Sequence, residues 1–336
     1  MATGILTTIT GNYPAPAWLA GSPTQEAMDD AIAMVLHTQL VAGIDLPTDG
    51  ELNRVDVNHP QSNGMVEYFL RRLRNVRTEI SRSEERMFRN DAGMDFRAKA
   101  SGVIEGQLGE GTLNLPADFA RSRALARGPL KFCVTSPYML ARTLVDRHYK
   151  TLEARAMAIA DILASQIAEI DAEVVQVDDE IITGNPQDAP WAAESIARLL
   201  GAAQRKAALR LAFGNYNGQA TMAGTYGPLV ALMNALPVDH VLVESACRDA
   251  AELSCFKELK PEIGIGLGVI DVKRMAIETP EDVARTIERA EKVLGPGRVT
   301  YVHPDNALLM LRRTVVSAKL VSLVKGRDLF EGRNRT

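Results

Sequence analysis

Hydrophobic and polar positions follow two alternating periods along this chain. Short β-branched runs predict buried strands, and longer stretches with apolar residues every three or four positions predict helices that face a core. The change from one period to the other is clearest near the end, where 299–302 predicts a strand and the apolar residues of 308–323 have helical spacing. His303, Asp305 and Asn306 therefore lie where a strand passes into a helix.

Eight such strands, nearly all followed by a helix, predict an α/β protein with a (βα)8 TIM barrel. A doubly wound sheet would usually have fewer strands and a glycine-rich first turn, whereas the glycines of 264–268 lie inside a predicted strand. The predicted strands are 6–10, 44–48, 130–135, 174–177, 209–213, 241–243, 263–269 and 299–302. The predicted helices are 27–41, 152–170, 192–208, 226–236, 248–258, 281–294 and a last one from 306 onward.

One long segment interrupts this alternation after the second strand. Residues 53–128 contain a predicted helix at 65–76, a basic stretch at 71–89 and a glycine-rich stretch at 102–111. Acidic residues interrupt the basic stretch, which indicates a solvated helix face. Because long insertions in compact domains are usually functional, we predict one domain, 1–336, in which 53–128 caps the site.

Composition narrows the class of protein. The 336 residues are 46% hydrophobic with a net charge of −4, which disfavours a nucleic-acid partner. No apolar run approaches ~18 residues and no signal-peptide pattern is present, so we expect a cytoplasmic protein without a membrane span. Cys133, Cys247 and Cys255 are too irregularly spaced for a disulfide framework or a structural zinc motif, so buried free thiols are predicted.

Polar residues gather at the predicted strand ends, which meet at one face of a barrel. Glu51, Asp178 and Glu244 directly follow apolar strands, where an acid needs a ligand, metal or cation to offset its desolvation. His303 could transfer a proton near neutral pH, and Lys273 could pair with acids, bind a carboxylate or form an imine. Further binding candidates, for which helix capping or a loop role is the alternative, are Asn12, Asp49, Arg54, His59, Gln176, Tyr216, Arg248, Asp305 and Asn306.

Several segments carry a resemblance to a known family. They are Thr7-Thr-Ile-Thr-Gly-Asn-Tyr-Pro14, Asp49-Gly-Glu51 with Met65-Val-Glu-Tyr-Phe69, Gln176-Val-Asp-Asp179, Val243-Glu-Ser245 with Arg248, and Val302-His-Pro-Asp305. In order and spacing the chain resembles the catalytic domain of cobalamin-independent methionine synthase, a (βα)8 barrel in the wider group that holds uroporphyrinogen decarboxylase and coenzyme M transferases. The resemblance implies that Glu51 and Asp178 hold the substrate amino group and that Glu244 matches a zinc ligand.

The chain departs from this family at its zinc site. The family's His-x-Cys falls on Arg210 and Ala212, its last cysteine falls on Asn306, and its proton-donating histidine falls on Lys273. A lone carboxylate cannot hold zinc, which takes about four N, S or O donors. The sequence therefore predicts no cofactor, and zinc or a reduced folate enters only under the alternative interpretation.

We therefore expect a lyase or group-transfer enzyme that acts by acid/base catalysis on a small polar substrate with a carboxylate. Glu51 and Asp178 would position the substrate, and His303 would move the proton. Lys273, Arg248 and Asn306 would stabilise developing negative charge. One alternative is a folate-dependent methyltransferase to a thiol, with a metal site rebuilt from Glu244, Cys247 and His303. Another is a non-catalytic binding protein. Substrate identity and oligomeric state, including a homo-oligomer, stay open.

Overall fold

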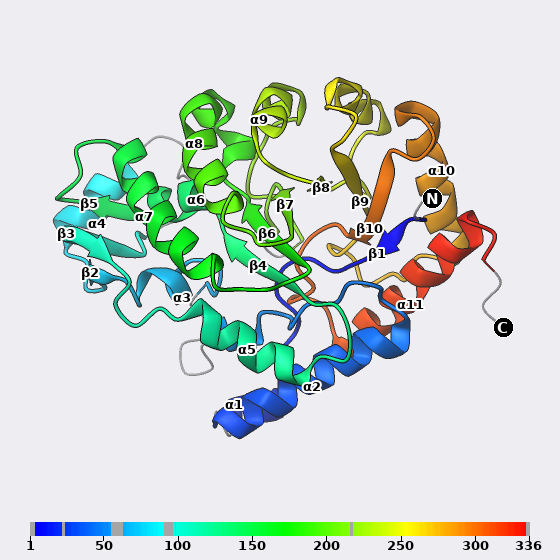
Figure 1. Ribbon diagram of the computed structural model, residues 1–336, viewed down its shortest axis with the longest axis horizontal. Coiled ribbons are helices and arrows are strands. Elements are labelled where there is room, and N and C mark those ends of the chain that lie inside the picture. Colours follow the sequence, from blue (N-terminus) through cyan, green and yellow to red (C-terminus); the bar gives the residue numbers. More distant parts are fainter. Residues whose placement is uncertain are drawn as a thin grey trace.

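The chain folds around a curled parallel sheet, seen in a computed structural model that describes residues 4–21, 24–54, 63–90, 97, 99–215 and 218–333 (Figure 1). Seven strands pair in the order β1-β10-β9-β8-β7-β6-β4, and every pairing is parallel. The strands are β1 (Leu6–Thr7), β4 (Lys131–Thr135), β6 (Val174–Asp179), β7 (Lys206–Leu211), β8 (His240–Val243), β9 (Gly264–Ile270) and β10 (Val299–Pro304).

The second predicted strand closes the ring with very few backbone contacts. Leu46 forms a single parallel bridge with Thr8, and Lys131 N donates a 2.9 Å hydrogen bond to the carbonyl oxygen of Pro47. Pro47 has no N–H to donate, which explains why this segment does not extend as a regular strand. The predicted barrel fold is confirmed, with one strand position reduced to a bridge.

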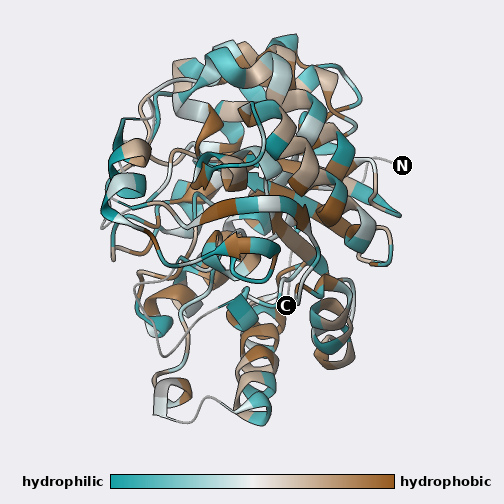
Figure 2. Ribbon diagram, turned by 90° about the vertical axis from the view of Figure 1, so that its left-hand side faces the viewer, coloured by the Kyte–Doolittle hydropathy of each residue, from teal (hydrophilic) through white to brown (hydrophobic). Residues whose placement is uncertain are grey.

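Helices surround the barrel, and in Figure 2 several carry hydrophilic and hydrophobic residues along the same helix, as amphipathic elements do. Threonines cap three of them, since Thr24, Thr151 and Thr279 accept a hydrogen bond from a backbone N–H in the first turn. The α-helices are α1 (Ala17–Gly21), α2 (Gln25–Ala42), α5 (Leu115–Leu125), α6 (Pro137–Arg142), α7 (Leu152–Ile167), α8 (Ala189–Leu200), α9 (Val230–Ala235), α10 (Pro280–Leu294) and α11 (Arg313–Phe330). The 3-10 helices are η1 (Leu52–Arg54), η2 (Ile182–Gly184), η3 (Pro186–Asp188), η4 (Gly227–Leu229) and η5 (Ala250–Glu258).

Several predicted helices have different limits in the structure. The helix predicted at 192–208 ends at Leu200, because β7 already begins at Lys206. The one predicted at 248–258 is the 3-10 helix η5. The last helix begins at Arg313 instead of near 306, because Leu308 N donates to the carbonyl oxygen of Asn12 and ties this segment to the strand ends.

A small second sheet lies at one edge of the barrel, in cyan and green at the left of Figure 1. β2 (Arg74–Arg77) pairs antiparallel with β3 (Gly102–Gly109), and β3 pairs parallel with β5 (Leu144–Asp146). The helix predicted at 65–76 is wrong, since α3 (Glu67–Leu70) is short and β2 follows it. The basic stretch is likewise divided between β2 and α4 (Arg82–Arg89) rather than being one helix face.

The interior of the barrel is filled below the strand ends. A compact layer there joins side chains of four strands with Leu46, and the ring of His240 stacks on that of Tyr301 at 4.3 Å. In the part of the chain that the structure describes, no helix combines the length and apolarity needed to cross a bilayer.

Candidate active site

Four acidic side chains meet at the carboxyl end of the barrel strands. Glu51 follows the bridging segment, Asp178 is the last residue but one of β6, Glu244 follows β8 and Asp305 follows β10. Each is at most 2% exposed. Burial is the main cause that raises the pKa of Glu51 and of Asp305, and the charges of Asp178 and Glu244, respectively, raise these two pKa values further. The structure thus brings these predicted residues together at one buried face.

Glu51 is held in an unusual backbone conformation. Its φ is +56°, in the left-handed region that non-glycine residues rarely adopt. Asp49 stabilises the turn, since its Oδ1 accepts from Glu51 N at 2.8 Å and its Oδ2 accepts from the Ser122 hydroxyl at 2.9 Å. Arg54 Nη1 lies 3.1 Å from Glu51 Oε2, yet neither carboxylate oxygen accepts a hydrogen bond. Asp49 therefore positions Glu51, whose oxygens stay available to a ligand.

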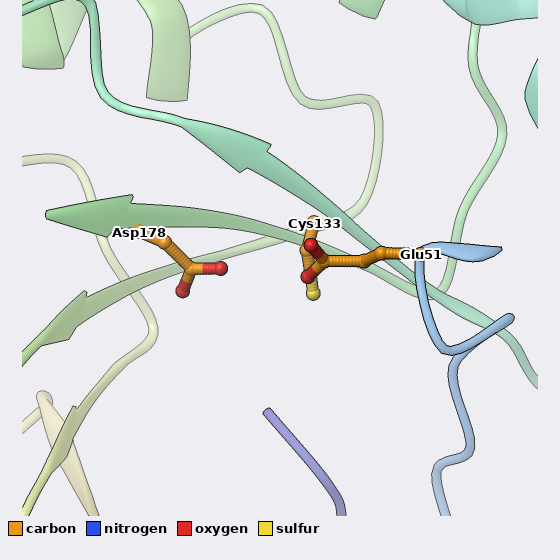
Figure 3. Close-up of side chains that lie close together, drawn as sticks. All are labelled: Glu51, Cys133 and Asp178. Atoms are coloured by element: carbon orange, nitrogen blue, oxygen red, sulfur yellow. The ribbon is translucent and has the colours of Figure 1, made fainter. Parts of the chain in front are cut away.

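Glu51, Cys133 and Asp178 point toward one another (Figure 3). Their ligand atoms lie within 4.8 Å of each other, and in the described part of the chain these three residues form the group that could hold a metal ion. Burial raises the pKa of Glu51 to about 7 and also raises that of Asp178. Two buried carboxyls this close favour a positively charged ligand, whether an ammonium group or a metal ion.

A polar chain runs beneath Asp178. Gln176 Nε2 donates to Asp178 Oδ1 at 2.6 Å, and Lys131 Nζ donates to Gln176 Oε1 at 2.7 Å. Burial lowers the pKa of Lys131 to about 8. Sequence analysis selected Gln176 but missed Lys131, because a lysine at the start of an apolar run gives no sign that it points into the barrel.

Glu244 is the centre of a second set of contacts. Its Oε1 accepts from Asn306 Nδ2 at 2.8 Å and from Phe213 N at 3.0 Å, and its Oε2 lies 3.3 Å from Lys273 Nζ. Glu244 is thus in direct contact with two other predicted site residues, Lys273 and Asn306. Both oxygens of Glu244 already have partners from the protein.

Asp305 is held by backbone donors and has one free oxygen. Its Oδ1 accepts from Ser245 N at 2.8 Å and from Ala246 N at 3.0 Å, while its buried Oδ2 has no partner. Gly268 makes room for it, because a Cβ there would lie 2.2 Å from Oδ1. Burial raises the pKa of Asp305 to about 7, so this carboxyl exchanges a proton near neutral pH.

His303 has a different environment from the one that its predicted role requires. The side chain is fully buried, Nδ1 donates to the Pro304 carbonyl oxygen at 2.8 Å, and Nε2 has no partner. Burial lowers its pKa to about 3, so the imidazole is neutral at physiological pH. A general acid needs an available proton near working pH, so this setting does not fit the proton-transfer role.

The metal site that could be rebuilt from Glu244, Cys247 and His303 is not formed. Among the described residues these three are not the metal-binding group, and Cys247 is exposed. The prediction of three buried thiols is also wrong in part, because Cys133 alone is buried while Cys255 is partly exposed.

The remaining predicted residues differ in how close they lie to the buried acids of the site. Arg54 is buried in η1 beside Glu51, and its Nη2 also donates to the carbonyl oxygen of Cys133. Arg248 pairs with Glu252 at 2.6 Å and lies over the Phe213 ring at 3.7 Å. Asn12 is buried. His59 and Tyr216 lie outside the described residues.

A cavity of about 470 Å³ lies beside this face, between the inserted segment and the barrel. It reaches Glu180, whose Oε1 is 3.4 Å from Arg210 Nη1. Its wall is mostly apolar, with several amide and hydroxyl side chains among the lining residues. The lining residues are Asn63, Val66, Arg97, Met139, Thr143, Glu180, Ile181, Asn215, Gln219, Ala220 and Thr221.

Comparisons with known proteins agree on one family. Residues 15–326 match the family described as cobalamin-independent synthase, catalytic domain. The chain is 29% identical over 335 residues to the methionine synthase of Sulfurisphaera tokodaii and to that of Sulfolobus acidocaldarius, covering 95% of this chain and 90% of each relative. A B12-independent methionine synthase from Shewanella sp. W3-18-1, solved with selenomethionine, has the same fold with a TM-score of 0.80, 21% identity and 98% of both chains covered.

These matches overturn the expectation of a site without any cofactor, because this family uses zinc and folate. The family's zinc position itself does not fit a metal here. Arg210 and Ala212 supply no ligand, Asn306 donates to Glu244, and Lys273 already pairs with that carboxylate. The described residues with suitable donors are instead Glu51, Cys133 and Asp178.

Proposed function

Because this chain belongs to the family of cobalamin-independent synthase catalytic domains, we propose that it transfers a methyl or similarly small group to or from a small polar substrate. The chain is a methionine synthase-like enzyme of the methyl-transfer type. We propose further that the substrate carries an amino group and a carboxylate. The observation that carries the proposal is the buried pair Glu51 and Asp178, in which Glu51 accepts no hydrogen bond.

Glu51 and Asp178 hold the substrate ammonium in this proposal. Ionised carboxylates are the natural partners of an ammonium group, and its charge would offset the cost of burying two acids. Asp49 and Gln176 position these acids through the hydrogen bonds described above. The tight backbone turn at Glu51 keeps its carboxylate aimed at the substrate.

Asp305 carries the proton in place of His303. Its free Oδ2 and a pKa near 7 suit a group that gives and takes a proton. Lys273 and Asn306 stabilise negative charge that develops beside Glu244. Arg248 supports this region from its pair with Glu252. In this proposal the segment 53–128 caps the site, and its described residues Asn63, Val66 and Arg97 line the neighbouring cavity.

A lyase reaction at the same face is the second candidate function. The observation that favours it is Lys273, a cation beside Glu244 where the family places metal chemistry. A lyase would convert one substrate alone, whereas a transferase needs both a donor and an acceptor. The two reactions are therefore distinguished by whether turnover requires a second substrate.

A labelled-methyl assay tests the proposal. The purified protein, supplied with zinc and a reduced folate bearing a ¹³C-methyl group, is incubated with a panel of small thiols, amines and amino acids. We expect mass spectrometry to detect ¹³C in one acceptor class, with Glu51→Gln and Asp178→Asn losing transfer and the surface variant Asp161→Asn retaining it. Turnover of a single compound without donor would favour the lyase, and binding without turnover of any compound would contradict both.

A further inference from the structure

Two cations lie beside Glu244, the carboxylate that matches a zinc ligand of the family: Arg210 is buried and Lys273 is partly buried. Lys273 Nζ is 3.3 Å from Glu244 Oε2, and its side chain is 14% exposed. The Arg210 side chain is 1% exposed, with Nη1 at 3.4 Å from Glu180 Oε1 and 3.9 Å from Asp178 Oδ1. Positive charge that a metal supplies in the family is supplied here by side chains, which unlike a metal cannot bind a thiolate by coordination.

Arg210 has more hydrogen-bonding capacity than its partners use. Its contacts to Glu180 are 3.4 and 3.5 Å long, at the weak end for an N–H donor, and its buried Nε has no partner at all. A guanidinium offers five N–H groups, and a buried donor without an acceptor is costly. The arrangement is therefore incomplete without a further acceptor, and an acid group is the acceptor that binds a guanidinium best.

The surrounding charges restrict what that acid can belong to. Asp178, Glu180 and Glu244 face the two cations, so a simple anion would meet repulsion. A simple amine could bind at Glu51 and Asp178 but would leave Arg210 Nε without a hydrogen-bond acceptor. A molecule that brings an ammonium group for the acids and an acid group for the cations meets both requirements.

We propose that Arg210 and Lys273 form an anion subsite at the former metal position, so that the substrate is a small zwitterion whose acid group replaces the family's thiol. The inference rests on the proposed function, because it places the ammonium at Glu51 and Asp178. The 3.9 Å separation of Arg210 and Asp178 makes the two subsites neighbours, which limits the ligand to a few bonds between its charges. Acidic amino acids and short ω-amino acids have this chemistry.

Calorimetric titration with matched probes tests the subsite. The probes are β-alanine, 4-aminobutyrate, L-aspartate and L-glutamate, each compared with the amide in which its distal acid is neutral. We expect the wild-type protein to bind at least one acid about 10- to 100-fold more tightly than its amide, the value of losing a charge-assisted hydrogen bond. Arg210→Met should abolish this preference with little effect on the amide, while the surface variant Arg198→Met should keep it.

Two further variants separate the possible failures. Lys273→Met is a second test of the preference if Arg210→Met does not fold, as judged by circular dichroism. Glu51→Gln should weaken acid and amide probes alike, and if it leaves both unchanged, the ammonium assignment of the proposed function is wrong. If Glu51→Gln weakens binding but every acid binds like its amide, the anion subsite alone is wrong. Failure of all the zwitterions to bind the wild-type protein would also overturn the subsite.

Discussion

At the scale of single residues, Glu51 shows how burial changes an ordinary side chain into one that senses pH. Its pKa of about 7 in the folded protein exceeds the usual glutamate value, so near pH 5 to 6 the folded state holds a proton that the unfolded chain has lost. Raising the pH removes this proton and leaves a buried charge, so the contribution of Glu51 to stability falls as pH rises toward 8.

Glu51→Gln should remove this dependence, because an amide does not ionise. We expect the melting temperature of the variant, relative to the wild type, to increase between pH 5 and pH 8. Each kcal/mol corresponds to roughly 2 °C for a domain of this size. Differential scanning calorimetry at several pH values measures this difference in melting temperature. A difference that stays constant with pH would show that Glu51 is already ionised at pH 5.

Asp305→Asn tests the proton carrier. The amide keeps the size of the side chain but cannot exchange a proton, so we expect turnover to fall by about 10²- to 10⁴-fold with little change in substrate affinity. His303→Gln is the matched comparison, because its neutral imidazole has no proton role in the proposed mechanism. A larger loss from the histidine change, with both variants folded, would return that role to His303.

The sequence predicted the acids of the site better than their partners. Glu51, Asp178 and Glu244 were recognisable because a carboxylate directly after an apolar strand must be compensated, and their meeting at one face follows from a parallel barrel. Local pattern could not reveal that Lys131 points inward or that His303 is sealed from solvent. Those properties depend on which strands become neighbours.

At the scale of elements, predictions succeeded where a helix or strand carries its own signals. Thr279 begins α10 with a capping box, in which its hydroxyl accepts from Asp282 N and the Asp282 carboxylate accepts from Thr279 N. The predicted helix at 65–76 failed because β2 exists only through pairing with β3, a partner more than twenty residues away. Pairing of that kind leaves no periodic signal in a short polar run.

Thr279→Ala should destabilise the protein by about 1 kcal/mol, the usual cost of losing an N-cap hydroxyl. Urea denaturation measures the change. Thr286→Ala is the control on the same helix, because its hydroxyl does not cap the helix: it donates to the Asp282 carbonyl oxygen and accepts from Arg289 Nη2. Equal losses from the two changes would contradict a specific capping role for Thr279.

At the scale of the whole molecule, closure of the barrel depends on the junction between β1 and β4, which has few backbone hydrogen bonds. Between β1 and β4 the ring is closed by the Thr8–Leu46 bridge and the hydrogen bond from Lys131 N to Pro47, whereas the other neighbouring strands pair over longer stretches. The Leu46 side chain is 3% exposed and packs in the interior layer with Val174, Ala208, Leu242 and Tyr301. This junction also carries the chain into Glu51, so its rigidity bears directly on the site.

Leu46→Ala should therefore weaken closure as well as packing. Truncating a buried leucine typically lowers the free energy of unfolding by about 2–5 kcal/mol. We also expect faster hydrogen exchange at the Lys131 amide in particular, because Pro47, which accepts its hydrogen bond, follows the truncated Leu46 side chain directly. Leu199→Ala, at a fully buried leucine in α8, is the matched control, since it should lower global stability without selectively exposing that amide. Equal exchange at Lys131 in both variants would mean that the ring opens only by global unfolding, and that Glu51 is held by its own turn rather than by the junction.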